Sequence, residues 1–335
     1  MAYDVIAIGE LLADLAETGK NEAGYPVFSA NPGGAPANFL AALAACGKKT
    51  AFIGKVGCDA FGDRLTATLA EAGIGTKGIV HDPEVFTTLA FVTLDEAGDR
   101  SFSFARKPGA DTMLREDEID FEMIDGAKVL HFGTLSLTGE PARTATKAAV
   151  RYAKEHGKFV TFDPNYRAPL WASEDAAKEQ MLWGLAQADM VKMSIEEAQL
   201  LWGAGCTEEQ AADRLLSGAE DAAAACVFIT LGSEGAYFAD RNERGYVRYA
   251  GGLNVVDTTG AGDIFGGTAL AALLDGIAES ADGRITGPGP GAAARAAVRA
   301  CAAASLSVGR PGGISSVPDA AGTETHTEFV KTVIL

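Results

Sequence analysis

The sequence predicts an α/β protein in which a mostly parallel β-sheet carries helices on both faces. Short apolar runs alternate with helical patterns along most of the 335 residues. Such alternation is typical of βαβ units, which build parallel sheets. Hydrophobic residues make up 47% of the chain and charged residues 22%. This composition is sufficient for a hydrophobic core and excludes a chain that is disordered throughout.

The expected elements follow one another from the N-terminus. Apolar runs bounded by turn residues predict strands at 5–8, 51–53, 128–132, 159–162, 190–193 and 226–229. Helical patterns predict helices at 36–46, 61–72, 141–155, 175–187, 195–202, 262–276 and 291–308. The first helix has Pro36 in its first turn and ends before Gly47, and the second ends before Gly73. We expect a loop at 287–291 and leave open whether the tail 323–335 is ordered or frayed.

One segment interrupts this alternation. Residues 87–94 and 101–104 are rich in β-formers and flank a turn-rich run at 95–99, which predicts a β-hairpin. A further short strand is expected at 26–28. These pieces predict a small β-sheet lid, formed by about 12–32 and 84–110, on a single domain that spans 1–335.

The charge and cysteine content narrow the class of protein. Lys and Arg number 28 and Asp and Glu 45, so the net charge is −17 and a nucleic-acid-binding surface is not expected. The five cysteines are scattered, which favours reduced thiols in a cytoplasmic protein and no zinc site. The start of the chain lacks a basic segment, so no signal peptide is expected. No apolar run reaches the roughly 18 residues of a membrane span, so no membrane association is expected.

Several well-known motifs are absent. The sequence has no G-x-x-x-x-G-K-[ST], which argues against a P-loop NTPase. The first expected strand leads into Gly9-Glu10-Leu11-Leu12 rather than G-x-G-x-x-G, which argues against a nicotinamide-dependent dehydrogenase. The four histidines have no recognisable catalytic setting, and we expect each to be structural or at the surface.

The most informative motif is D-T-T-G-A-G-D-I-F-G-G at 257–267, a glycine-rich turn that opens an expected helix. Backbone N–H groups at a helix start, together with the helix dipole, favour an anion. Asp263 would lie in the first turn, where a carboxylate can take a proton from a substrate hydroxyl. The alternative is an ordinary glycine-rich turn with an aspartate at the helix start, but the length of the string favours a site.

A second motif, G-G-A-P-A-N at 33–38, opens another expected helix. Paired glycines let a polar ligand approach the backbone closely. Asn38 offers both a donor and an acceptor, which suits a polyhydroxy ligand. Taken alone, this motif is better explained by an ordinary Gly-Pro helix start with an incidental Asn.

Together the two motifs resemble the two signatures of the ribokinase-like carbohydrate kinase family, also called the PfkB family. The resemblance extends from Gly9 to about Pro318 and departs at Leu40 and Thr268, where the family has smaller residues. It implies a ribokinase-like three-layer α/β/α sandwich with a mostly parallel central sheet and a small β-sheet lid. The strings at 9–14, 105–111 and 162–167 are most similar to those of bacterial fructokinases, although ketodeoxygluconate kinases share several of them.

The resemblance also implies roles for individual residues. Asp263 would be the catalytic base, and the amides of Gly260, Ala261 and Gly262 would form an anion hole. Contacts to the sugar or the transferred phosphate would come from Asp14, Gly33, Gly34, Asn38, Arg106 and Arg167. For Arg106 a surface salt bridge is an equally good explanation. For Arg167, which follows an expected strand end, a functional role is the better one.

The nucleotide and ion sites are implied in the same way. Nucleotide contacts would come from Lys192, Ser194, Glu197, Thr230, Gly232, Ser233 and Gly235. Ser194 replaces the family's Asn, whereas Glu197 keeps the acidic position associated with Mg²⁺. A monovalent cation, K⁺, would lie near Asp257, Thr259, Ser307, Gly312 and Ser316.

The activity implied is that of an ATP-dependent phosphotransferase with an alcohol acceptor, most similar to a fructokinase that makes fructose 6-phosphate. Kinases of the same fold for 2-keto-3-deoxygluconate, ribose or a nucleoside remain alternatives. A sugar-binding protein without activity is a further alternative, against which the intact Asp263 motif argues. The expected partners are a small sugar and MgATP. A homodimer through the lid is also expected, because a small open sheet leaves edges to cover.

Overall fold

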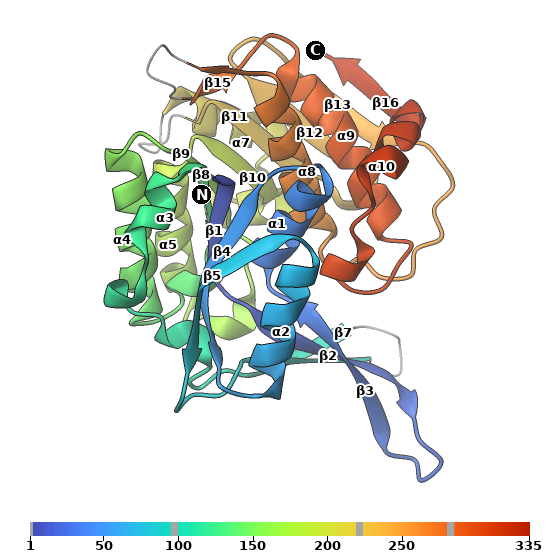
Figure 1. Ribbon diagram of the computed structural model, residues 1–335. Coiled ribbons are helices and arrows are strands. Elements are labelled where there is room, and N and C mark those ends of the chain that lie inside the picture. Colours follow the sequence, from blue (N-terminus) through green and yellow to red (C-terminus); the bar gives the residue numbers. More distant parts are fainter. Residues whose placement is uncertain (1–2, 95–99, 219–223, 280–284) are drawn as a thin grey trace.

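A ten-stranded β-sheet forms the centre of the molecule (Figure 1). The computed structural model describes residues 3–94, 100–218, 224–279 and 285–335. The strand order is β16-β13-β12-β11-β10-β9-β8-β1-β4-β5. The strands are β1 (Tyr3–Ile8), β4 (Thr50–Gly57), β5 (Ile74–Asp82), β8 (Ala127–Gly133), β9 (Phe159–Asp163), β10 (Met190–Ser194), β11 (Cys226–Thr230), β12 (Ala236–Asp240), β13 (Arg244–Tyr249) and β16 (Val330–Ile334). Strands β5 to β11 in this order pair in parallel and β12, β13 and β16 pair antiparallel, which confirms the mostly parallel sheet.

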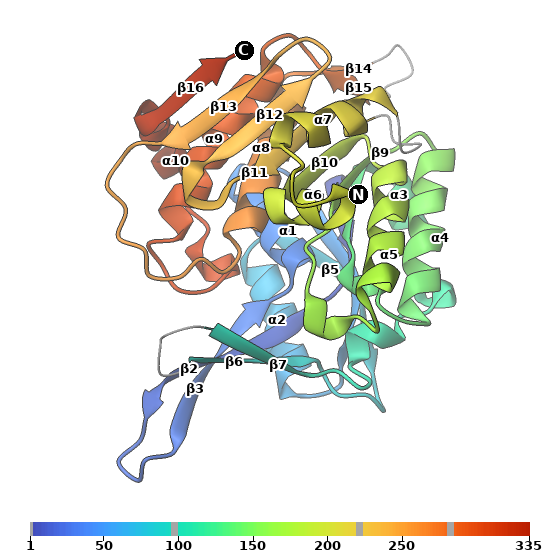
Figure 2. The same ribbon diagram turned by 180° about the vertical axis from the view of Figure 1, so that it is seen from behind.

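Helices cover both faces of this sheet (Figures 1 and 2). One face carries α1 (Ala35–Ala45), α2 (Ala60–Glu71), α8 (Ala261–Asp275), α9 (Ala292–Ser307) and α10 (Ala320–His326). The other face carries α3 (Phe121–Asp125), α4 (Ala142–Glu155), α5 (Glu174–Gln187), α6 (Ile195–Trp202) and α7 (Glu208–Ser217). Each face has its own hydrophobic core beneath the helices. In β1, Val5 and Ala7 pack on the face that carries α1 and α8, while Ile6 and Ile8 pack on the face that carries α4 and α5, because side chains alternate along a strand. The three-layer sandwich is therefore confirmed.

A second sheet of four strands projects from one end of the main body (Figures 1 and 2). Its order is β3-β2-β6-β7, with β2 (Leu12–Lys20), β3 (Pro26–Gly33), β6 (Leu89–Leu94) and β7 (Arg100–Ala105). The expected hairpin is confirmed as β6 and β7, and its loop at 95–99 lies outside the described residues. The strand expected at 26–28 is the first part of the longer β3. We call these four strands the lid; the treatment of 1–335 as one domain stays a prediction.

The C-terminal part departs from the expectations. The loop expected at 287–291 begins inside a strand, because β15 (Ile285–Pro288) pairs with β14 (Ile277–Glu279). Two elements that the sequence did not predict, α10 and β16, follow the helix expected at 291–308. The tail is ordered as β16, which pairs antiparallel with β13 at the edge of the main sheet. Short 3₁₀ turns complete the fold at Ala110–Met113, Glu116–Glu118, Leu135–Leu137, Ala168–Leu170, Gly232–Glu234, Ile314–Ser316 and Thr327–Phe329.

The topology brings several functional segments to one edge of the main sheet. The loops that follow β1, β9, β10 and β11 leave the carboxyl ends of parallel strands in the middle of the sheet, where β8 separates β1 from the other three. This edge is the usual position of ligand sites in open α/β sheets. The N-terminal ends of α1 and α8 reach the same edge, and the lid lies across from them. Within the described ranges, no helix is long and apolar enough to cross a lipid bilayer.

Candidate active site

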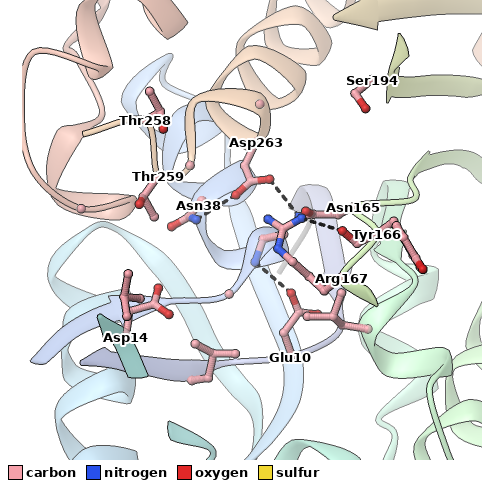
Figure 3. Close-up of a pocket in the computed structure, with 18 of the residues that line it drawn as sticks. Glu10, Asp14, Asn38, Asn165, Tyr166, Arg167, Ser194, Thr258, Thr259 and Asp263 are labelled. Carbon is pink, nitrogen blue, oxygen red and sulfur yellow. Dashed lines mark hydrogen bonds between the residues drawn. The ribbon is translucent and has the colours of Figure 1, made fainter. Parts of the chain in front are cut away.

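A cavity of about 850 Å³ lies between the carboxyl edge of the main sheet and the lid (Figure 3). The starts of α1 and α8 line one side, and the loops after β9 and β10 line another. The lid contributes an apolar surface made by Leu12, Ala16, Val92 and Phe104. The cavity therefore joins both glycine-rich motifs of the sequence in one space.

Asp263 lies in the first turn of α8 and is only 9% exposed. Its Oδ2 accepts a hydrogen bond from Asn38 Nδ2 at 2.8 Å, and its Oδ1 accepts one from Asn165 Nδ2 at 3.2 Å (Figure 3). Burial and, to a lesser degree, the nearby Asp163 carboxylate raise the pKa of Asp263 to about 6, against the opposing effects of Lys192 and of the hydrogen bond from Asn38. The side chain is thus ionised at neutral pH and can accept a proton.

The start of α8 is a turn with unusually close packing. Gly260, the N-cap residue, has φ 77°, and a Cβ atom there would lie 2.9 Å from the Cα of Gly313. A Cβ atom on Gly262 would lie 2.8 Å from Lys192 Nζ. Gly260 and Gly262 line the cavity, as expected for an anion hole. Ala261 does not line it, and its N–H donates to Thr258 O at 3.3 Å.

Lys192 supplies a buried positive charge beside this turn. Its Nζ lies 2.9 Å from Asp163 Oδ2. Burial opposes the charge, but the carboxylates of Asp163, Glu197 and Asp263 outweigh it and hold the pKa of Lys192 above its ordinary value. The ammonium group therefore stays charged next to the helix start, where it adds to the positive potential of the helix N-terminus.

The lid side of the cavity carries Asp14, which lies on β2 opposite Asn31 of β3. A Cβ atom on Gly33 would lie 2.2 Å from Asp14 Oδ2, so Gly33 makes room for the carboxylate without lining the cavity itself. Gly34 has φ 119°, and a Cβ atom there would lie 2.5 Å from Glu10 O. Burial raises the pKa of Asp14 to about 7 while Arg167 lowers it. Arg167 points into the space between Asp263 and Glu10 (Figure 3).

Arg106 neither lines the cavity nor forms a surface salt bridge, the two alternatives expected for it. Its side chain is 4% exposed and forms an ion pair with the fully buried side chain of Asp111, with Nε–Oδ2 at 2.8 Å and Nη2–Oδ2 at 2.6 Å. It also donates to Thr138 Oγ1 at 2.9 Å and Leu135 O at 2.8 Å. It is absent from the cavity lining and is a buried anchor rather than a surface salt bridge. In the sequence, this ion pair is indicated only by the short separation of Arg106 and Asp111.

Two cavity residues that hydrogen-bond to the glycine-rich motifs were missed by the motif analysis. Glu10 is 2% exposed, and its Oε1 accepts a hydrogen bond from Ala35 N at 2.9 Å. Burial raises the pKa of Glu10 to about 7. Asn165 contacts Asp263 as described above. Both belong to strings that resemble the family, but the sequence does not show which side chain of such a string enters the cavity.

The nucleotide positions divide into two groups. Thr230, Ser194 and Glu197 line the cavity, whereas Gly232, Ser233 and Gly235 lie outside its lining. Ser194 caps α6, and both oxygens of Glu197 accept backbone N–H groups, from Tyr166 at 2.7 Å and from Ser194 at 2.8 Å. Glu197 therefore joins the loop after β9 to the start of α6.

Gly235 has a structural explanation that the motif analysis did not find. Its φ is 104°, and a Cβ atom there would lie 2.0 Å from Val247 O. The β12–β13 hairpin therefore needs glycine at this position, because any side chain would clash with the backbone of the neighbouring strand.

Three of the five positions expected for a cation come together. Asp257 accepts hydrogen bonds from Thr259 N and Gly312 N, both at 2.9 Å. Asp257, Thr259 and Gly312 line the cavity, while Ser307 and Ser316 are buried and absent from its lining. This set offers carboxylate, hydroxyl and carbonyl oxygens, which suit a hard cation. Among the described residues, no group of three or more His, Cys, Asp or Glu side chains is arranged to hold a metal ion.

Comparison with known proteins shows the family to which the chain belongs. The family model described as pfkB family carbohydrate kinase matches residues 3–320. The chain is 39% identical over 273 residues to the probable fructokinase-4 of Arabidopsis thaliana, covering 81% of this chain and 82% of that protein. It is 40% identical over 272 residues to fructokinase-1 of Zea mays, covering 81% and 83%.

Solved structures are similar over almost the whole chain. The fructokinase of Xylella fastidiosa with bound ATP has a TM-score of 0.84 at 30% identity, covering 97% of this chain and 98% of that one. The fructokinase of Vibrio cholerae O395 with fructose, ADP and calcium ion has a TM-score of 0.82 at 31% identity, covering 97% and 99%. Since the family model spans nearly all of the sequence, the chain belongs to the pfkB family of carbohydrate kinases.

Proposed function

We propose that this protein is an ATP-dependent sugar kinase that phosphorylates fructose to fructose 6-phosphate. The observation that carries the proposal is the buried Asp263 carboxylate, which faces the cavity from the glycine-rich start of α8. The fructokinases among its relatives and structural neighbours, one with bound ATP and one with fructose and ADP, support the same substrates.

The residues of the cavity suit a phosphoryl transfer. Asp263 takes the proton of the sugar's C6 hydroxyl. The hydroxyl oxygen forms a bond to the γ-phosphorus of ATP, and the bond from that phosphorus to the bridging oxygen breaks, so that ADP departs. The N–H groups of Gly260 and Gly262, with Lys192 beside them, stabilise the charge on the transferring group. We keep Ala261 in the anion hole as a weaker member, because its N–H already has an acceptor.

The nucleotide is proposed to lie beside Ser194 and Thr230, with Gly232, Ser233 and Gly235 in the adjoining loop. When bound, Mg²⁺ neutralises charge on the nucleotide phosphates and needs few protein ligands. Because both Glu197 oxygens already accept backbone N–H groups, we place Glu197 near the ion through water. A K⁺ ion would be held by the oxygen atoms around Asp257, Thr259, Ser307, Gly312 and Ser316.

We place the sugar at the lid end of the cavity, which we call the sugar end. The charged side chains there favour a neutral substrate. Glu10, Asp14 and Glu17 line this end, with Arg167 as the facing cation. Arg106 pairs with Asp111, and Lys192 pairs with Asp163. A sugar acid such as 2-keto-3-deoxygluconate would bring its own carboxylate toward these groups, which opposes binding. This charge argument places ketodeoxygluconate behind fructose. Ribose and nucleosides are neutral, and we place them behind fructose because the relatives and solved structures named above are fructokinases.

The test combines a substrate panel with a variant of the base. ADP release is measured with fructose, 2-keto-3-deoxygluconate, ribose and a nucleoside, and fructose is expected to give the highest kcat/KM. Asp263→Asn is expected to lower kcat by about 10²–10⁴-fold, the usual contribution of a general base. Asp319→Asn, at the exposed N-cap of α10, is the matched control and should keep wild-type activity. A folded Asp263→Asn protein with near-wild-type kcat would refute the mechanism, and sugar binding without turnover would favour a binding protein.

The assembly and location are further parts of the proposal. We propose a homodimer through the lid in the cytoplasm. The lid sheet ends in β3 and β7, and Tyr25 and Val27 at its β2–β3 end are exposed apolar side chains, which supports an interface there. Light scattering after size-exclusion chromatography tests it, and a wild-type monomer at micromolar concentration would exclude it.

A further inference from the structure

We propose that Asn165 is a positioning residue that holds the Asp263 carboxylate in the orientation needed for proton transfer. This inference rests on the proposed function and adds a role that the sequence motifs did not assign. Asn165 belongs to the string 162–167, of which only Arg167 was given a part in the site.

The first argument is the geometry around the base. Asp263 has two carboxylate oxygens, and a different amide donates to each of them (Figure 3). Asn38 reaches Oδ2 from α1, and Asn165 reaches Oδ1 from the loop after β9. Two donors on opposite oxygens fix the rotation of the carboxylate plane, which a single donor does not. Each oxygen keeps a second lone pair that can accept the substrate proton.

The second argument is the way in which the Asn165 loop is held. Asn165 N donates to Asp163 Oδ1 at 3.1 Å, and the hydroxyl of Thr134 donates to Pro164 O. Tyr166 N donates to Glu197 Oε1 at 2.7 Å. These contacts hold the backbone on both sides of Asn165, so its amide is directed at Asp263 before any substrate arrives. Such preorganisation is what makes a positioned group effective in catalysis.

The third argument is the backbone conformation of Asn165. Its φ is 44°, in the left-handed region that non-glycine residues seldom adopt but that asparagine tolerates better than most. Asn165 is also 9% exposed, so its amide is largely removed from water. The conformation would suit glycine equally well, and the presence of asparagine therefore points to its side chain.

The fourth argument is electrostatic. Asp163 on β9 and Asp14 on the lid are negative groups near Asp263, while Lys192 on β10 and Arg167 are positive ones. Burial and Asp163 favour the protonated acid, whereas N–H donors favour the carboxylate. Loss of the Asn165 amide should therefore shift Asp263 toward its protonated form.

Two substitutions at one position test the proposal. Asn165→Gly removes the amide and keeps the backbone conformation, whereas Asn165→Asp keeps the shape but replaces the donor with a second carboxylate. Asn242→Gly, in the exposed turn between β12 and β13, is the matched control for an Asn-to-Gly change and should behave as the wild type. Full-length proteins are compared by kcat, by KM for fructose and for ATP, and by the pH dependence of kcat.

We expect kcat of Asn165→Gly to fall about tenfold or more while both KM values stay within about twofold, the pattern of an interaction that acts in the transition state. The acidic limb of its pH profile should move to higher pH. Asn165→Asp should move the limb further in the same direction and recover activity at alkaline pH, because two neighbouring carboxylates do not ionise independently.

Two results would overturn the inference. The first is a folded Asn165→Gly protein with unchanged kcat and an unchanged pH profile. The second is a rise in KM for fructose at constant kcat, which would make Asn165 a sugar ligand. If Asn165→Gly melts at a much lower temperature than the control, Asn165→Asp decides by its pH profile. A wild-type protein that phosphorylates no sugar refutes the proposed function, whereas an active wild type with an insensitive Asn165 refutes only this inference.

Discussion

The contact between Gly33 and Asp14 offers a steric test of the sugar end of the cavity. A Cβ atom on Gly33 would lie 2.2 Å from Asp14 Oδ2 and 2.8 Å from its Cγ, where ordinary contacts begin at 3.4 Å. Gly33→Ala would therefore displace the carboxylate by about 1.2 Å, the difference between 3.4 and 2.2 Å. The backbone itself accepts alanine, because Gly33 lies in a strand and outside the left-handed region. The substitution changes the position of Asp14 without changing its charge.

The expected effect follows from the energy of the hydrogen bonds that Asp14 would make to sugar hydroxyls. A hydrogen bond to a charged group contributes about 1.5–3 kcal/mol, and each 1.4 kcal/mol is a factor of about ten in affinity. KM for fructose should therefore rise about 10- to 100-fold. KM for ATP should stay unchanged, because Asp14 lies on the lid and the nucleotide positions lie beside β10 and β11.

Steady-state assays of ADP release at varied fructose and varied ATP measure both constants. Gly205→Ala is the matched control, because a Cβ atom there meets no other atom within 4 Å. If Gly33→Ala is folded and its KM for fructose rises no more than that of Gly205→Ala, the carboxylate of Asp14 does not contact the sugar.

Three further predictions concern charge. Burial raises the pKa of Asp263 to about 6, so kcat/KM should fall as the pH drops below about 6. The same acidic fall in kcat/KM should remain in the Asp14→Asn variant. If that variant loses it, the titrating group is Asp14 and not Asp263. Arg106→Leu leaves Asp111 as an unpaired buried charge and should lower the free energy of unfolding in urea by about 3–5 kcal/mol. A fully stable Arg106→Leu protein with a raised KM for sugar would contradict this prediction and show that Arg106 contacts the substrate. Burial also raises the pKa of Asp14 and Glu10 to about 7 in the folded state, which then binds more protons than the unfolded chain between about pH 4 and 7. Their contribution to stability falls as the pH rises through that window, so Asp14→Asn should gain stability relative to wild type from about pH 4 to 7. A stability difference that is independent of pH would contradict this prediction.

Local patterns predicted most of the main sheet and its helices. The strands expected at 128–132 and 190–193 and the helices expected at 36–46 and 195–202 agree with β8, β10, α1 and α6 within one residue or so at each end. Their apolar periodicity and their Pro and Gly boundaries are properties of a few neighbouring residues. In contrast, β16 pairs with β13 across 81 or more residues of sequence, and no local pattern signals such an edge strand.

The candidate site also has features that depend on neighbouring residues and features that depend on distant ones. The glycine-rich strings and Asp263 were visible in the sequence, because a turn that exposes backbone N–H groups needs small residues at fixed spacing. The partners of Asp263 were not, since Asn38 and Asn165 lie 225 and 98 residues away from it. The roles of all these residues in catalysis stay predictions until the variants are measured.

The sequence by itself determined the family, the α/β alternation and the position of the candidate base, because these depend on residue type and short spacing. Only the tertiary structure decided that Arg106 is a buried anchor, that Glu197 holds two backbone N–H groups, and that two amides hold Asp263. The physical reason is that a side chain's function depends on its burial and its partners. Both arise when segments distant in the chain pack together, and a single sequence does not record that packing.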